Sequence, residues 1–241
     1  MMSSHVKGIV VLLIFLLMGG LACAVPGFTP AAPAPSPTPP GDMLFLQAPY
    51  TYNLTSGGRV PGTQLEYIEA TGDSFRMRID GAEATKRIGD SFPWKGVVGP
   101  GVLGNYNLRL TTALGGNLPA VGTVKLTVLN PEPQEVVTAV PPVPEKLHYG
   151  GIIINYNVPV GREVPGSTMV FEGVSNQSGI TAAQLSGISG YAFFAQGDSL
   201  VWQGQLRENV YVRYDLRVVT LSEENLLLGG TAELWITPSE P

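Results

Sequence analysis

Apolar and polar residues alternate one by one along several short stretches of this chain. The clearest stretch is 210–218, whose apolar members are Val210, Val212, Tyr214, Leu216 and Val218. Residues 102–110 and 75–79 follow the same pattern, and the latter ends in Asp80-Gly81, a dipeptide typical of tight hairpin turns. Because successive side chains of a strand point to opposite faces, this alternation predicts strands with one buried face.

Helical periodicity is weak by comparison. After the first 23 residues no window keeps apolar residues at helical spacing over three turns, although a short helix over residues 178–188 fits the sequence. The chain also contains 30 glycines and 21 prolines, which suit many turns between short strands. This combination is typical of an antiparallel sandwich or small barrel.

A large part of the chain is an internal repeat. Residues 52–133 recur as residues 156–241, with a short insertion in the second copy. The matches include Gly89-Asp90-Ser91 with Gly197-Asp198-Ser199, and Trp94 with Trp202. A repeat of this length predicts two copies of one fold.

The fold class that follows is all-β, with two tandem antiparallel β-sandwich or small-barrel modules from an internal duplication. The expected boundaries are a signal segment at 1–23, a Pro-rich linker at 24–42, module 1 at 43–130, a Pro-rich inter-module linker at 131–145 and module 2 at 146–241. The chain has a single cysteine, Cys23, so no disulfide joins strands within either module. Each module is therefore expected to bury a core of its own.

The N-terminus carries the features of an export signal. Lys7 precedes the uncharged, largely apolar run 8–22, which is shorter than a membrane-spanning helix needs. Leu21-Ala22-Cys23 resembles a bacterial lipobox, with its leucine one position nearer the cysteine than usual, so Cys23 is the expected lipidation site. An ordinary cleaved signal or an uncleaved anchor are the alternatives. The prolines at 26–40 would form an extended stalk beyond the anchor.

The charge of the chain limits its partners. A net charge of −5 disfavours nucleic acid, which rewards a basic surface. No cofactor motif is present, and no His/Cys cluster or Asp-rich loop suggests a metal, so we expect neither. Asn53 and Asn176 begin N-glycosylation sequons, which matter only in an organism that glycosylates exported proteins. The expected partners are a membrane, through the anchor, and an envelope protein or glycan.

One motif suggests catalysis. Residues 197–200 spell Gly-Asp-Ser-Leu, for which a class of esterases is named, and such a serine needs a histidine downstream as its base. The only histidines are His5 and His148, both upstream. We therefore interpret the motif as a turn, in which glycine adopts positive φ and the Asp and Ser side chains bond the local backbone.

Two aromatic sets have different interpretations. Trp94 and Trp202 recur in both copies, which favours a place in each core over an exposed platform for sugar rings. Trp235 lies on the outward phase of its strand, where the first copy has Thr127. It is either covered by Arg213 or Arg217 through a cation–π contact, or part of an exposed contact patch with Tyr211.

The sequence thus predicts an exported, lipid-anchored surface protein with a noncatalytic binding or structural role. Its candidate binding surface is Tyr211, Arg213 and Trp235. The alternative is a secreted hydrolase, with carboxylates such as Asp73, Asp80 or Glu172 meeting between the modules. We predict no catalytic residue.

Overall fold

The computed structural model describes residues 41–112, 117–137, 146–177 and 179–238. Every regular element in these residues is a strand, as the alternation predicts. The described part holds no helix of the length and hydrophobicity that a membrane crossing would require. The short helix predicted over 178–188 is wrong, because β12 (Ile180–Ser186) pairs along its whole length with β11 (Val170–Gln177).

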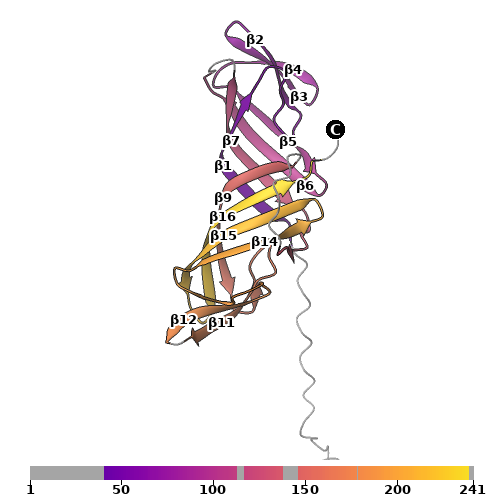
Figure 1. Cartoon of the computed structure of the whole chain (residues 1–241). Coiled ribbons are helices and arrows are strands. Elements are labelled where there is room, and N and C mark those ends of the chain that lie inside the picture. The colour runs from indigo at the N-terminus through magenta and orange to yellow at the C-terminus, as the bar shows by residue number, and fades with distance from the viewer. Residues whose placement is uncertain (1–40, 113–116, 138–145, 178, 239–241) are drawn as a thin grey trace, which may run out of the picture. The chain divides into compact units, whose positions relative to one another are not determined.

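The first half of the chain forms seven of the described strands (Figure 1). They are β1 (Met43–Leu54), β2 (Leu65–Thr71), β3 (Ser74–Ile79), β4 (Ala82–Lys86), β5 (Ser91–Gly99), β6 (Val102–Leu110) and β7 (Leu118–Val128). The second half adds, besides β11 and β12, the strands β8 (Gln134–Glu135), β9 (Leu147–Pro159), β10 (Arg162–Glu163), β13 (Phe193–Ala195), β14 (Ser199–Arg207), β15 (Val210–Leu221) and β16 (Asn225–Ile236).

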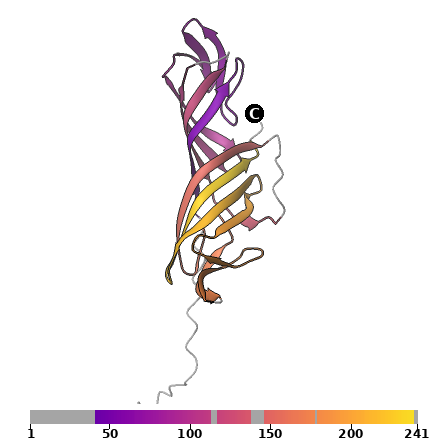
Figure 2. The same cartoon turned by 60° about the vertical axis from the view of Figure 1, so that its left-hand side comes forward.

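Antiparallel pairing arranges these strands in four sheets. Sheet I has the order β1-β7-β6-β5, and sheet II has the order β8-β14-β15-β16-β9. Each half also has a small sheet, β2-β3-β4 in the first and β10-β11-β12-β13 in the second. Figures 1 and 2 show β14, β15 and β16, in orange to yellow, side by side in one layer. Apart from the added edge strands β8 and β10, the second half repeats the strand order of the first.

Buried and less buried residues alternate along β15, as the sequence pattern predicts. The residues Val210, Val212, Tyr214, Leu216 and Val218 of β15 are all buried. The predicted hairpin turn between β3 and β4 is confirmed as well. Its two residues, Asp80 and Gly81, have φ values of 49° and 82°. Positive φ at both positions is what a two-residue hairpin with matching strand twist requires.

The two recurring tryptophans belong to the core, as predicted. Trp94 packs edge-on against Tyr106, and Trp202 stacks on Tyr214. The glycine two residues after each tryptophan leaves room for the ring, because a Cβ at either glycine would overlap the indole. Both indole nitrogens donate hydrogen bonds, Trp94 Nε1 to Asp80 Oδ1 at 2.8 Å and Trp202 Nε1 to Thr168 Oγ1 at 3.2 Å. Buried indole N–H groups are thereby satisfied.

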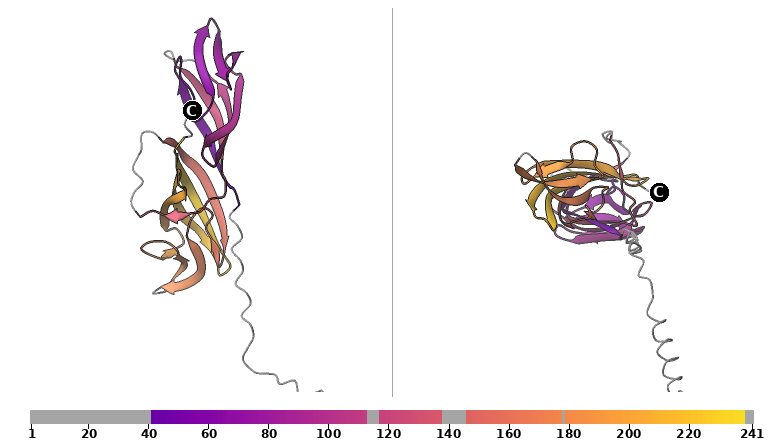
Figure 3. Two further views of the ribbon diagram at one scale, coloured as in Figure 1. Left: turned by 90° about the vertical axis from the view of Figure 1, so that its right-hand side faces the viewer. Right: turned by 90° about the horizontal axis from the view of Figure 1, so that it is seen from below.

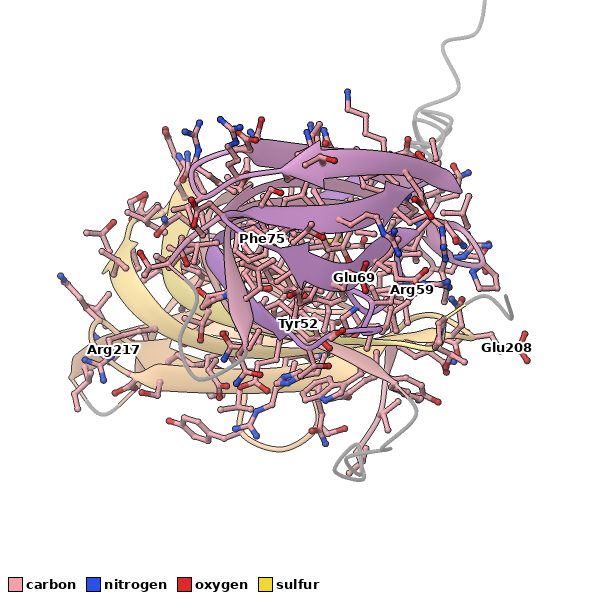
Figure 4. The ribbon with its side chains drawn as sticks, turned by 90° about the horizontal axis from the view of Figure 1, so that it is seen from above. Tyr52, Arg59, Glu69, Phe75, Glu208 and Arg217 are labelled. Carbon is pink, nitrogen blue, oxygen red and sulfur yellow. The ribbon has the colours of Figure 1, made fainter. Side chains whose placement is uncertain are left out.

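The core is one continuous cluster shared by both halves. Buried apolar residues from the two halves belong to a single hydrophobic cluster, and Pro39–Pro241 form one compact unit. Figure 4 shows side chains filling the space between the strands of the two halves. The expectation that each module buries its own core is therefore wrong. Strands β1 and β9 have 12 and 13 residues, whereas strands of the small sheets have at most 8, so a small sheet covers only part of the long one.

Two reciprocal contacts join the halves. Leu147, at the start of β9, places its Cδ1 atom 2.5 Å from where a Cβ on Gly62 would lie. Met43, at the start of β1, occupies the equivalent space beside Gly166. Both glycines follow Val-Pro and have φ of 72°. Since Met43 and Leu147 open equivalent strands, each half inserts the same position into the same turn of the other.

A pair of tyrosines extends this junction. The hydroxyl groups of Tyr106 on β6 and Tyr149 on β9 share a buried hydrogen bond, and Tyr50 packs against both rings. Burial raises the pKa of Tyr149 to about 12 and that of Tyr106 further still, so both stay neutral. The bond across the halves is therefore between neutral hydroxyls.

The second half lacks the equivalent bond. Tyr214 corresponds to Tyr106, but its buried hydroxyl interacts with the Tyr156 hydroxyl of its own half, and no described residue of the first half offers it a hydrogen bond. The strand position equivalent to Tyr149 is Phe45, since Phe45 faces Leu126 and Tyr149 faces Leu234. The Tyr214 hydroxyl lies instead against Gly166, and its ring packs edge-on against Tyr156. One side of the junction thus has a hydrogen bond across the halves, and the other keeps its tyrosine hydroxyls within one half.

This asymmetry gives opposite expectations for two substitutions. Phe45→Tyr gives the second half of the junction the hydroxyl that Tyr149 supplies in the first, and it should raise the free energy of unfolding by up to about 1 kcal/mol. Tyr149→Phe leaves the Tyr106 hydroxyl unpaired and should lower it by about 1–2 kcal/mol. Urea unfolding of the two variants and the parent measures both changes. A loss of stability in Phe45→Tyr would show that the second half cannot accept the bond.

Candidate functional site

The outer face of sheet II carries a row of large polar and aromatic side chains. Strand register places Gln205 opposite Tyr211, Tyr211 opposite Trp235, and Trp235 opposite His148. These four residues, one from each of β14, β15, β16 and β9, are called the aromatic row. Tyr211 and Trp235 are half-buried and His148 is exposed. Two of the three predicted binding residues thus lie side by side.

Each ring of the aromatic row is supported on one face. His148 stacks on Trp235, with ring centroids 5.1 Å apart and planes 12° apart. The Lys146 ammonium lies 3.9 Å from the centroid of the Tyr211 ring, and desolvation lowers the pKa of this lysine. The interpretation that Arg213 or Arg217 covers Trp235 is wrong, because the cation that the described residues place over a ring is Lys146, on Tyr211. Figure 4 shows Arg217 at the periphery of the folded part.

Charged groups border the aromatic row on the next row of the sheet. Arg213 Nη2 donates to Asp215 Oδ1 at 3.0 Å on its own strand. Glu233, opposite Arg213 on β16, lies 3.3 Å from His148 Nε2. Both pairs are partly exposed, so each adds little to stability. Arg213, the third predicted residue, therefore lies beside the aromatic row and keeps an exposed guanidinium.

The first half shows what the fold itself requires at these positions. On sheet I the equivalent row is Val97, Leu103, Thr127 and Leu44, again one residue from each of four neighbouring strands. Three of these are exposed aliphatic residues, called here with Thr127 the aliphatic row. Because the same backbone is built with either row, packing does not demand the aromatic side chains of sheet II.

The chemistry of the aromatic row suits recognition. Tyr, Trp and Arg are enriched among the residues that dominate binding energy at protein interfaces. The row contains one imidazole, that of His148, with the Glu233 carboxylate beside it. None of its four residues is a serine or cysteine that could act as a nucleophile with this imidazole as base. No group of three or more His, Cys, Asp or Glu suited to hold a metal occurs in the residues that the structure describes.

The Gly-Asp-Ser-Leu motif joins a turn to a strand. Gly197 and Asp198 lie at the turn, as predicted, whereas Ser199 and Leu200 are the first residues of β14. Gly197 has φ of 91°, and the Asp198 carboxylate accepts a hydrogen bond from Ala195 N at 2.8 Å. The equivalent turn has the same bond, from Arg87 N to Asp90 Oδ2. Ser199 lies opposite Arg217, and the row continues through Gly229 to Asn155 on β9. His148 is about 20 Å further along that strand, too far to act on Ser199.

The carboxylates proposed for a hydrolase do not converge. Asp73 and Asp80 lie in the turns at opposite ends of β3, about 20 Å apart. Asp80 accepts the Trp94 indole N–H, and Glu172 on β11 accepts a hydrogen bond from Ser186. Each of these two has a local structural partner, and the three lie on different elements.

Three residues of the site were missed by sequence reasoning: Lys146, His148 and Gln205. A usable signal existed for His148, since it falls on the outward phase of β9 at the position equivalent to Leu44 on β1. The pairing of β9 with β16 is what brings it to Trp235, and sequence alone does not reveal that register. Of the other predicted sites, Cys23 lies outside the described residues. Asn53 and Asn176 are exposed on β1 and β11.

Comparison with protein-family models, with curated proteins and with solved structures finds no match to this chain.

If the fold does not need the aromatic row, its residues can be exchanged for those of sheet I at small cost. Trp235→Thr and Tyr211→Leu should each change the free energy of unfolding by less than about 1 kcal/mol. Trp202→Leu, a matched change in the core, should cost about 3 kcal/mol or more. Urea unfolding compares the three variants. A cost for Trp235→Thr as large as that for Trp202→Leu would assign Trp235 to the fold.

Proposed function

We propose that this chain is an exported, lipid-anchored, noncatalytic binding protein of the cell surface. In this proposal its two β modules arose by duplication, and the outer face of sheet II contacts a protein of the cell envelope. The observation that carries the proposal is the aromatic row beside Arg213, on a sheet whose counterpart in the first half keeps the same backbone with aliphatic residues.

The supported rings favour a protein partner over a glycan. A sugar ring binds by covering an aromatic face. His148 and Lys146 already cover one face each of Trp235 and Tyr211, which leaves a sugar at most one face of each ring. Rings held in this way present edges, polar tips and the nearby charges of Arg213, Asp215 and Glu233. That mixture matches the aromatic centre and polar rim of protein interfaces.

The N-terminal region supports a location at a membrane surface. An apolar segment ending at Cys23 and a following Pro-rich stretch suit a lipid anchor joined to a semi-rigid spacer. The spacer would hold the β modules away from the lipid, so that the aromatic row can meet a partner. Both features belong to residues outside the described ones, and the anchor therefore rests on sequence.

The contact can be tested by site-specific crosslinking in the native membrane. A photoreactive phenylalanine analogue at Gln205, beside Tyr211 on the outer face, should crosslink the protein to its partner. Protease treatment should digest the crosslinked partner, which would identify it as a protein. The yield of the crosslinked product should fall at least about tenfold when Trp235→Thr and Tyr211→Leu are added, because these substitutions remove the side chains expected to contribute most of the binding free energy.

The matched control places the same analogue at Val97, the equivalent position on sheet I. Its adducts should not respond to Trp235→Thr. A Gln205 adduct that glycosidases remove and proteases do not would favour a glycan. The absence of any adduct that depends on Trp235 would contradict the proposed site.

The anchor has a separate test. Cys23→Ser removes the thiol that a lipid would modify, so the protein should move from the membrane fraction to the medium or soluble fraction. Immunoblotting of the fractions measures the shift, with Ser3→Ala as a control outside the lipobox. Full membrane retention of the Cys23→Ser protein would favour an uncleaved helical anchor.

A further inference from the structure

The outer edges of sheets I and II differ in one respect. In sheet II the edge of β14 is covered by β8, whose Glu135 pairs with Gly204 and Gln134 with Gln205. In sheet I the equivalent strand β5 is the last, and no strand in the described part of the chain pairs with its outer side. Figure 3 shows the two sheets from two further directions.

The segment that covers β14 is an extended stretch of the predicted linker. Glu132 N donates to Leu206 O at 2.8 Å, and Val136 N donates to Gln203 O at 3.0 Å. Its backbone comes so near that a Cβ on Gly204 would lie 2.5 Å from Gln134 O. The Glu135 carboxylate is held by the backbone and side chain of Ser189. An acidic, extended segment thus completes this edge.

The edge of β5 has the same geometry as that of β14. Both strands have an irregularity at the same place, between Val97 and Gly99 in β5 and between Gln205 and Arg207 in β14. Because Gln203 O points to β8, the N–H and C=O of the equivalent Lys95 point to the open side. The backbone nitrogen of Pro93, two residues earlier, is on the same open side of β5. Proline is tolerated there because this side makes no hydrogen bond to another strand.

The surface next to this edge is apolar and basic. A hollow of about 390 Å³ on the outer face is lined by Val97, Leu103, Thr127, Lys95, Asn105 and Lys125. Val97 and Leu103 are 56% and 41% exposed, although both are aliphatic. Lys95 and Lys125 flank Asn105 on neighbouring strands, about 10 Å apart, and neither forms an ion pair with a described carboxylate.

We propose that the edge of β5 binds an extended, acidic segment of another polypeptide, which adds as a strand to sheet I. Main-chain hydrogen bonds to Lys95 supply affinity, and alternate side chains supply selectivity. In the antiparallel register that β8 has on β14, the residue opposite Val97 is apolar and the residue opposite Lys95 is acidic. Charge complementarity selects this partner, since a second copy of sheet I would bring lysines to lysines. This site lies on sheet I and is independent of the aromatic row.

The chain supplies its own probe. A labelled peptide of residues 130–137 with Gln134→Val and Val136→Glu carries the predicted apolar and acidic residues in the register of β8. The comparison peptide has Val136→Lys instead. Fluorescence anisotropy with the full-length protein in detergent should show that the acidic peptide binds about fivefold more tightly than the basic one, as one exposed ion pair allows.

Two variants of Lys95 separate the two contributions. Lys95→Glu should reverse the preference, so that the basic peptide binds more tightly. Lys95→Pro removes the outward N–H without touching the β5–β6 ladder and should weaken both peptides about tenfold. Arg217→Glu, the same charge change on sheet II, should leave binding unchanged, and so should Trp235→Thr. The parent's urea midpoint, kept by each variant, shows that the fold is intact.

Several results would overturn the proposal. Neither peptide binding would mean that Pro93 and Lys95 serve only to keep the edge unpaired. Equal binding of both peptides, or no response to Lys95→Glu, would remove the basis for an acidic partner. A dimer of the full-length protein that Lys95→Pro dissociates, with no peptide binding, would assign the edge to a second copy.

Discussion

The fold depends on the inability of either half to cover its own long sheet. Strands β1 and β9 are longer than the strands of the small sheets, and the part of their apolar faces that the small sheet leaves uncovered packs against the other half of the chain. The contacts of Leu147 with Gly62 and of Met43 with Gly166 are the same contact made twice. With no cysteine in the described strands, the cohesion of the protein comes from this shared apolar core and the hydrogen-bonded ladders.

A shared core also determines which surfaces are open for binding. The inner face of each long sheet is buried in the core, so the outer faces and the edges are the surfaces that a partner could contact. On sheet II the edge is closed by β8 and the outer face carries aromatic residues with charged neighbours. On sheet I the edge is open and the outer face is aliphatic and basic. Two sheets with one backbone plan therefore offer chemically different surfaces.

The sequence predicts features that depend on residues close together in the chain, and it fails where residues far apart in the chain decide the structure. Alternation predicted strands and their buried faces, and the Asp80-Gly81 dipeptide predicted a hairpin turn, because these features depend on neighbours in the chain. Recurrence in both copies predicted Trp94 and Trp202 as core residues, and their burial confirms it. The short helix over 178–188 failed because pairing with β11 decides that segment. The prediction of a separate core in each module failed because the area of each long sheet that its small sheet leaves uncovered is known only once the strands are paired.

The candidate site was predicted in the same uneven way. Trp235 stood out because the first copy has Thr127 at its position, and Tyr211 was named with it as an outward residue of the neighbouring strand. His148 on β9 and Lys146 just before that strand complete the site from a segment far away in sequence, and only the register of β9 on β16 brings them there. The choice of an arginine over Trp235 failed for this reason, since the stacking partner comes from a strand that local spacing does not reveal.

The reciprocal insertion of Met43 and Leu147 has a consequence for how such a chain could originate. A single ancestral module with this turn and this strand would cover its uncovered face by pairing with an identical module around a two-fold axis. Joining two such modules in one polypeptide would fix the pairing and would allow the residues on each side of the junction to change independently. The junction has the kind of difference that such a release would allow. Tyr106 bonds Tyr149 across the halves, whereas Tyr214 has Phe45 at the equivalent position and interacts with Tyr156 of its own half.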